Sequence, residues 1–214
     1  MIVTPFLFII LLILAVPFLL AMGFFHLVRL GFENLGFPPE LVLLTLGLML
    51  VGSFINIPLG RMKAVEVMER SFFGLFSKRK LMAHGLSLNV GGGLIPLGIA
   101  GFLLFHVPLQ ETLVATLLMT LICWKLARVI PGRGIAVPFL APPLFAALFA
   151  FLLAPQEPAL VAFVSGTLGV LFGADLLRLP WVLRGEVGVM SIGGAGVFDA
   201  VFLVGISAAL LAGL

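Results

Sequence analysis

The sequence TPFLFIILLILAVPFLLAMGFFHLV, residues 4–28, contains no charged residue. A helix needs about 20 apolar residues to cross the roughly 30 Å hydrocarbon core of a bilayer, and this stretch is longer. A secretory signal peptide would begin with basic residues and have a shorter apolar core, so we interpret the stretch as a retained membrane span. The whole chain has this character: hydrophobic residues make up 62% of its 214 positions and charged residues only 10%.

The remaining sequence predicts further spans. Six more apolar stretches follow, over residues 41–58, 86–106, 109–124, 135–154, 159–177 and 187–214. The fourth span, 109–124, is the weakest because it is short and carries Glu111 near its start. We therefore predict an all-α fold, a polytopic transmembrane helix bundle of about seven spans that forms a single integral membrane domain over residues 1–214.

The basic residues predict how this bundle is oriented. All but one of the twelve Lys and Arg residues follow spans two, four and six, on alternate loops, and only Arg29 lies on the other side. The positive-inside rule places these loops in the cytoplasm, with the N-terminus inside and the C-terminus outside. The opposite side carries Glu33, Glu40, Glu111 and Glu157. We expect a multi-pass protein of the cell (inner or plasma) membrane.

Residues 61–84 form a basic segment between spans two and three. The segment combines Lys and Arg with apolar residues such as Phe72, Phe73 and Phe76. We predict a cytoplasmic interfacial loop or helix whose partners are the lipid bilayer and anionic headgroups; the alternative is a segment that docks a partner or gates a substrate. The sequence pI near 9.6 does not indicate nucleic acid binding, because the charge is confined to loops beside spans.

Two aspartates are the polar residues that most need an explanation. Asp175 and Asp199 are the only aspartates of the chain, and both lie within predicted spans. An aspartate at a helix centre costs about 2.5–3.5 kcal/mol on insertion, so each is a functional-site hypothesis. A rise of about 1.5 Å per residue places both roughly 22–27 Å below the outer boundary, on spans that we expect to be antiparallel neighbours. The side chains of Asn56 and Asn89 reach the same level.

Two glycine-rich stretches accompany this polar layer, LNVGGGLIP at 88–96 and SIGGAGVFD at 191–199. Such stretches mark either tight helix packing or a broken helix whose backbone lines a cavity. Their candidate substrate- or ion-binding residues are Gly91, Gly92, Ser191, Gly193, Gly194 and Gly196. Gly169 and Gly173 form a separate small-xxx-small pattern that predicts a close helix contact.

The same stretches suggest an internal repeat. GSFINIPLGR at 52–61 and FGADLLRLP at 172–180 each end a descending span with a proline and an arginine. Each is followed by a basic loop, a serine and a double glycine. This pattern predicts a parallel repeat of spans one to three and five to seven, with span four as the linker, as in transporters with a site between the repeats.

The segments GADLLRLP at 173–180 and SIGGAGVFDAVFLVGI at 191–206 resemble an uncharacterised family of bacterial and archaeal membrane proteins, known as domain of unknown function 1614. That resemblance implies no activity. More loosely, the chain is similar to the GxGD intramembrane aspartyl proteases such as presenilin, which carry one aspartate on a descending sixth span and another on an ascending seventh. It departs from them in three ways: Val197 and Phe198 separate the glycines from Asp199, Ala174 stands in place of tyrosine, and no later span brings a PAL motif.

Three functions follow from these observations. The first is an intramembrane aspartyl protease-like hydrolase, in which Asp175 and Asp199 are catalytic, share one proton and cleave a helical peptide, while Asn56 or Asn89 orients the substrate backbone. The alternative is a small proton- or cation-coupled transporter or channel for a small solute that uses the same aspartates. In the third, a membrane scaffold, Asp175 pairs with Arg178 and Asp199 links helices.

The sequence predicts no metal site and no cofactor. His26, His84, His106 and Cys123 lack metal-ligand spacing. The GGG and GGAG stretches lack the following lysine and the βαβ setting of phosphate-binding loops, so we expect no nucleotide, haem or flavin.

Overall fold

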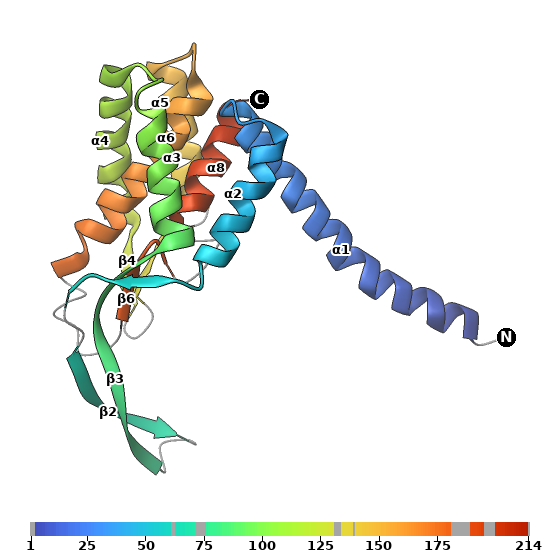
Figure 1. Ribbon diagram of the computed structural model, residues 1–214, viewed down its shortest axis with the longest axis vertical. Helices are drawn as coiled ribbons and strands as arrows, with labels where there is room; N and C mark the ends of the chain where they lie inside the picture. The colour runs from blue at the N-terminus through green and yellow to red at the C-terminus, as the bar shows by residue number, and fades with distance from the viewer. Residues whose placement is uncertain are drawn as a thin grey trace.

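The structure is a computed structural model, and it describes residues 3–60, 63–71, 76–130, 134–138, 140–180, 189–194 and 200–213. Within these residues seven helices run alternately up and down, which confirms the predicted helical membrane bundle. Two short π-helical segments are joined to them, η1 before α3 and η2 after α6 (Figure 1). The helices are α1 Val3–Asn34, α2 Pro39–Gly52, α3 Ile95–Leu103, α4 Leu109–Leu126, α5 Ala141–Leu153, α6 Pro158–Val170 and α8 Ala200–Ala212; the π-helical segments are η1 Val90–Leu94 and η2 Leu171–Leu176.

Three of the helices in the described residues are long and apolar enough to cross a membrane: Ala15–Asn34, Leu109–Leu126 and Pro158–Leu176. The span that looked weakest in the sequence, α4, is one of them. The other apolar helices have 10–17 residues: Pro39–Gly52, Val90–Leu103, Ala141–Leu153 and Val201–Ala212. A helix of 14 residues, such as α2, is about 21 Å long, so it covers only part of a hydrocarbon core of roughly 30 Å.

The helix α6 is the centre of the bundle. All residues from 161 to 167 are buried, and α6 packs against α3, α4, α5 and α8. A Cβ added at Gly169 would press on Met119 of α4, and one at Gly173 would press on Cys123 and on the backbone of the same helix. The close helix contact predicted for these two glycines is therefore confirmed.

A small sheet lies at one end of the bundle. Its long central strand, β3 (Phe76–Asn89), pairs antiparallel with β1 (Asn56–Pro58) and β2 (Lys63–Ser71), and parallel with β6 (Val189–Ile192). Strands β2 and β3 form a hairpin that extends away from the helices (Figure 1). A second pair, β4 (Arg128–Ile130) with β5 (Gly134–Ala136), lies at the same end. We call this end of the bundle the hairpin end.

The described part of the 61–84 segment forms two strands, whereas we expected an interfacial loop or helix. Its two strands keep one register from Lys63, opposite His84, to Ser71, opposite Phe76. Val65 and Val67 flank Glu66, which is the alternation of a strand, and β-branched residues favour strands over helices. Cross-strand hydrogen bonds then satisfy the main-chain groups that a helix would have satisfied internally.

The predicted spans two, three and seven were wrong at the hairpin end. They extended to residue 58, from 86 and from 187, but the structure has strands β1, β3 and β6 at those positions. Ile57 precedes Pro58, a position that disfavours the helical conformation. Gly193 and Gly194 have φ values of +75° and +64°, which no helix contains. The sheet pairs the main-chain groups that the broken helices leave free, as membrane depth requires.

The fifth span also begins later than the sequence predicted. Strand β5 occupies 134–136, and helix α5 begins at Ala141 rather than near residue 135. Pro142 and Pro143 lie in its first turn, where a missing N–H breaks no helical hydrogen bond.

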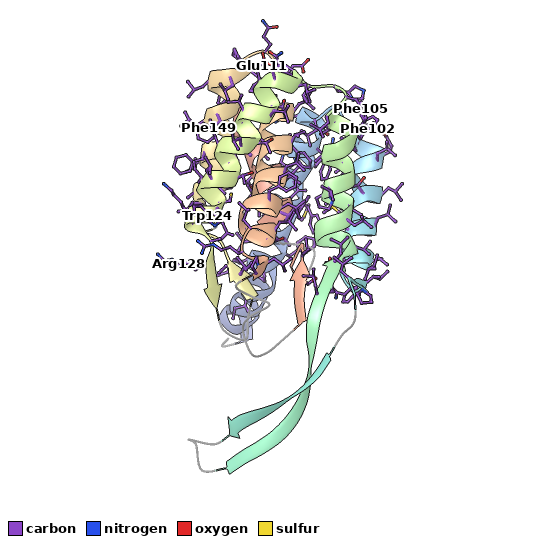
Figure 2. All side chains as sticks on the ribbon, turned by 90° about the vertical axis from the view of Figure 1, so that its left-hand side faces the viewer. Phe102, Phe105, Glu111, Trp124, Arg128 and Phe149 are labelled. Atoms are coloured by element: carbon purple, nitrogen blue, oxygen red, sulfur yellow. The ribbon has the colours of Figure 1, made fainter. Side chains whose placement is uncertain are left out.

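The two ends of the bundle carry opposite charge. Figure 2 shows Trp124, in α4, and Arg128, at the start of β4, toward the hairpin end, and Glu111 at the far end of α4. Glu40 and Glu157 likewise stand at the start of α2 and just before α6, at the end away from the hairpin. We call that end the acidic end. The separation of charge agrees with the alternation of loops seen in the sequence.

Candidate functional site

Asn89 stands where β3 becomes η1, and its side chain is fully buried. Its Oδ1 accepts a hydrogen bond from the main-chain N–H of Gly92 at 2.8 Å and so caps the first turn of η1. Its Nδ2 donates to the carbonyl oxygen of Ser53 at 2.8 Å and to Oδ1 of Asn56 at 3.2 Å. Asn89 therefore joins the start of one broken span to the end of another.

Asn56 completes this arrangement with a third segment. It faces Asn89 in the register of β1 and β3, and its Oδ1 also accepts a hydrogen bond from the hydroxyl of Ser191 at 2.8 Å. Asn56, Asn89 and Ser191, which we call the amide cluster, come from three different predicted spans. The structure thus brings together the two asparagines of the predicted polar layer and Ser191, a candidate from the glycine-rich stretch that accompanies it.

Glycines let the backbones meet beside the amide cluster. Residues Ser191 to Gly194 form a tight turn closed by a 3.1 Å hydrogen bond from Gly194 N–H to the Ser191 carbonyl. Its third residue, Gly193, has a φ of +75°, the value for which such turns use glycine. A Cβ on Gly193 would also press on the backbone of Gly93. The turn therefore packs directly on η1.

The triple glycine that begins η1 packs on its other side against α2. A Cβ on Gly91 would meet the carbonyl of Met49 and the amide of Ser53, and Gly91 and Gly92 are both buried. The two readings offered for the glycine-rich stretches, tight packing and broken helices, are both present at this point.

Asp175 lies in η2, half-buried, against the same turn. Its Oδ2 accepts a hydrogen bond from the main-chain N–H of Gly193 at 3.2 Å. The scaffold hypothesis paired this aspartate with Arg178. In the structure the Arg178 guanidinium donates to the Trp124 carbonyl, at 2.6 Å from Nη2 and 3.2 Å from Nε, and lies 5.6 Å from the centre of the Trp124 ring. Arg178 therefore ties the end of η2 to the end of α4.

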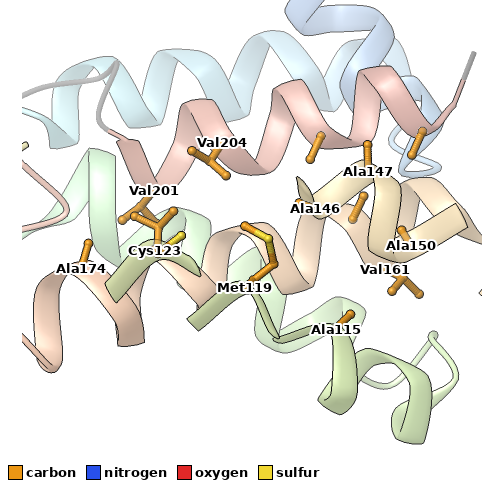
Figure 3. Packing of buried hydrophobic residues seen from close by; sticks show 14 of the residues in the cluster. Ala115, Met119, Cys123, Ala146, Ala147, Ala150, Val161, Ala174, Val201 and Val204 are labelled. Carbon is orange, nitrogen blue, oxygen red and sulfur yellow. The ribbon is translucent and has the colours of Figure 1, made fainter. Parts of the chain in front are cut away.

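Asp199 and Gly196, two of the predicted site residues, lie outside the described residues. Their surroundings are partly described. Helices α6 and α8 are antiparallel neighbours, as predicted for spans six and seven. Ala174, the residue before Asp175, and Val201, two residues after Asp199, belong to one buried cluster with Cys123 (Figure 3). The chain next to each aspartate is thus packed into the same part of the core.

The site lies at irregular helix. The two π-helical segments among the described residues both carry site residues, since Asn89 caps η1 and Asp175 lies within η2. Single π-helical turns are rare and frequently occur at functional sites. The chemical groups on hand are one carboxylate, two amides and a hydroxyl. Among the described residues no group of three or more His, Cys, Asp or Glu is placed to hold a metal ion.

Sequence reasoning missed three contributors to this site: the Ser53 carbonyl, Gly93 and the Arg178–Trp124 contact. The third glycine of GGG was a visible signal for Gly93, because a triple glycine suggests backbone approached from more than one side. A carbonyl such as that of Ser53 has no signal in the sequence, since every residue has one.

Comparison with known proteins gives a family but no activity. No curated protein and no solved structure matches the chain, so the looser resemblance to GxGD proteases has no support from these comparisons. The model of one family, described as a protein of unknown function (DUF1614), matches residues 50–211. That range contains Asn56, Asn89, Asp175, Ser191 and Gly193. The chain therefore belongs to the DUF1614 family.

Proposed function

We propose that this protein is an intramembrane aspartyl hydrolase that cleaves helical peptides near the hairpin end of the bundle. One observation carries the proposal: the carboxylate of Asp175 is bound to the amide of Gly193, on the segment that leads to Asp199 six residues later. The turn that holds Asp175 therefore lies six residues before the only other aspartate of the chain. Ala174, the residue before Asp175, and Val201, two residues after Asp199, belong to one buried cluster, which also supports a pairing of the two aspartates.

Two carboxylates in a low-dielectric site do not both ionise easily, so the pair holds one proton between them. The ionised carboxylate takes a proton from a water molecule, and the resulting hydroxide attacks the carbonyl carbon of the peptide bond. The protonated carboxyl gives its proton to the carbonyl oxygen, which yields a neutral tetrahedral intermediate. When the C–N bond breaks, the leaving nitrogen takes a proton from one carboxyl while a hydroxyl of the intermediate gives a proton to the other carboxylate. The products are an amine and a carboxylic acid, and the pair again holds one proton.

The described residues supply what this chemistry needs around Asp175. The Gly193 amide fixes one carboxylate oxygen, and the tight turn fixes Gly193 itself. Asp175 is only half-buried and Asn56 is exposed, so the described residues enclose neither side chain. A peptide bond inside a helix is sterically covered and hydrogen-bonded, so a protease must bind its substrate in an extended form. The protein's own spans are broken into strands at this end, which provides extended backbone for such a substrate to lie along.

The test is cleavage of single-span peptides by the purified protein in lipid nanodiscs. Asp175→Asn and Asp199→Asn are each expected to reduce cleavage by about 10³-fold or more, because paired catalytic groups act as a unit. Glu157→Gln, the same change of charge at the acidic end, serves as the control and should cleave at the wild-type rate. Thermal unfolding of each variant checks folding. Full cleavage by either aspartate variant would reject the proposal.

A second candidate is a proton- or cation-coupled transporter. The observation that favours it is the interruption of three predicted spans at one level, beside polar side chains and glycine backbone. Discontinuous helices of this kind form ion sites in transporters. The test is proton or cation flux into proteoliposomes across a panel of solutes. Flux that disappears in Asp175→Asn, with no peptide cleaved by the wild type, would favour this candidate over the hydrolase.

A further inference from the structure

The amide cluster fixes which way the side chain of Asn56 faces. The main-chain N–H of Gly92 can only donate, so the atom of Asn89 that meets it is the oxygen, Oδ1. The Ser53 carbonyl can only accept, so the other atom of Asn89 is Nδ2. Because that Nδ2 also donates to Asn56, the atom of Asn56 that meets it is Oδ1. Main-chain groups thus settle an assignment that is otherwise ambiguous for amide side chains.

The oxygen of Asn56 is then fully used, and its nitrogen is not. Oδ1 has two lone pairs and accepts two hydrogen bonds, from Asn89 and from the Ser191 hydroxyl. The Nδ2 group makes no hydrogen bond within the described part of the chain, and Asn56 is exposed. Two N–H donors are therefore held in a fixed direction, away from Asn89 and Ser191, at the open side of the site.

We propose that Asn56 binds a main-chain carbonyl oxygen of an extended peptide substrate beside Asp175; this rests on the proposed hydrolase function. A ligand of Nδ2 must be a hydrogen-bond acceptor, which excludes a cation. The carboxylate of Asp175, which is bound by the same turn, disfavours an anion. A neutral carbonyl satisfies both conditions, and each peptide unit of a substrate carries one.

One turn holds both Asn56 and Asp175. The Ser191 hydroxyl binds Asn56 and the Gly193 amide binds Asp175, so a peptide with one carbonyl on Asn56 brings a nearby peptide bond to Asp175. Asn89 has no such role, because its own oxygen and nitrogen are already bonded inside the protein.

The experiment is an ester scan of a single-span peptide that contains the cleaved bond. Each peptide bond near the cleavage point is replaced in turn by an ester, whose carbonyl is a weaker acceptor. Binding is measured by fluorescence anisotropy in nanodiscs with the Asp175→Asn protein, so the readout needs no catalysis. We expect one ester position near the cleaved bond to weaken binding about tenfold, the worth of one neutral hydrogen bond.

The matched variant is Asn56→Asp in the same background. It keeps an oxygen for Asn89 and Ser191 and removes the N–H donors. It should weaken binding of the all-amide peptide about tenfold. In this variant the peptide with the sensitive ester should bind no more weakly than the all-amide peptide, because the substitution and the ester remove the same contact. Gln156→Glu, an exposed amide-to-acid change at the acidic end, should leave binding and the ester profile as in the parent.

The outcomes separate this inference from the proposed function. A uniform ester profile, or no peptide binding at all, overturns the role of Asn56. A single sensitive carbonyl that persists unchanged in Asn56→Asp overturns it as well. If the sensitive carbonyl is found and depends on Asn56, but the wild-type protein cleaves no peptide, the site binds peptide and the hydrolase proposal fails alone. If Asn56→Asp does not fold, Asn56→Ala, which also removes the N–H donors, takes its place in the same comparison.

Discussion

Ser87 and Ser191 lie opposite each other across the parallel strands β3 and β6. Each serine is followed by a glycine-rich segment that leads into a rising helix, α3 after Ser87 and α8 after Ser191. The two segments that suggested an internal repeat in the sequence are therefore neighbours in space. They pack through Gly93 and Gly193, and the polar side chains of the site surround this contact.

Replacement of Gly193 by alanine should destabilise the protein more than the same change at Gly36. Both glycines have positive φ, +75° and +80°, so each alanine carries a conformational cost of about 1–2 kcal/mol. A Cβ at Gly36 meets open space, whereas one at Gly193 presses on the backbone of Gly93 and adds about 1–3 kcal/mol. Thermal unfolding in detergent measures both. Equal shifts would mean that the contact of the turn with η1 contributes nothing.

Gly91→Ala and Gly98→Ala should change stability in opposite directions. Gly98 lies in α3 with nothing near a Cβ, so alanine there should gain about 0.5–1 kcal/mol of helix stability. At Gly91 a Cβ would push apart the Met49 carbonyl of α2 and η1, at a cost of about 1–3 kcal/mol. The melting temperature of Gly98→Ala should rise and that of Gly91→Ala should fall. A rise in both would contradict the close approach of α2 and η1.

Removal of the Asn89 side chain should be costly although the residue touches no substrate in our account. Asn89→Ala leaves the buried amide of Gly92 and the carbonyl of Ser53 without their partners, at about 1–3 kcal/mol for each. Ser165→Ala is the control, because that buried hydroxyl makes only a 3.5 Å hydrogen bond within its own helix. Similar free energies of unfolding for the two variants would show that the amide cluster does not stabilise the fold.

The hydrolase proposal predicts a bell-shaped dependence of kcat/KM on pH. Activity requires one proton on the aspartate pair, so it falls at low pH when a second proton binds and at high pH when the last proton leaves. The two apparent pKa values belong to the pair and not to either residue. A rate that only rises across the measured range would indicate a single base instead of a coupled pair.

Part of this site followed from the sequence by elementary physics. Asparagines and aspartates inside apolar spans are costly in lipid, so they must face the protein, and a fixed helical rise gives their depth. That reasoning placed Asn56 and Asn89 at one level, and the structure confirms that their side chains meet. The depth calculated from the helical rise was correct although the chain is partly extended at that level, because each segment leaves its helix only near the site.

The remainder depended on information that the order of residues does not carry. Ile57, Leu88 and Ile192 are apolar in a helix or a strand alike, so composition did not reveal that they belong to a sheet. The pairing of β3 with β6 joins residues about 100 positions apart, and no local pattern sets that register. The hydrogen bond between Asp175 and Gly193 follows from that register and from a turn at positive φ.

The most direct test of the account uses the fact that the chain has only two aspartates. Protein made with aspartate labelled with ¹³C at the side-chain carboxyl contains one pair of labels, Asp175 and Asp199. Solid-state NMR in lipid bilayers then measures a single carbon–carbon distance. We expect a dipolar coupling that corresponds to about 4–6 Å, the range in which two carboxyls share a proton. No measurable coupling between the two carboxyls would contradict a paired aspartate site.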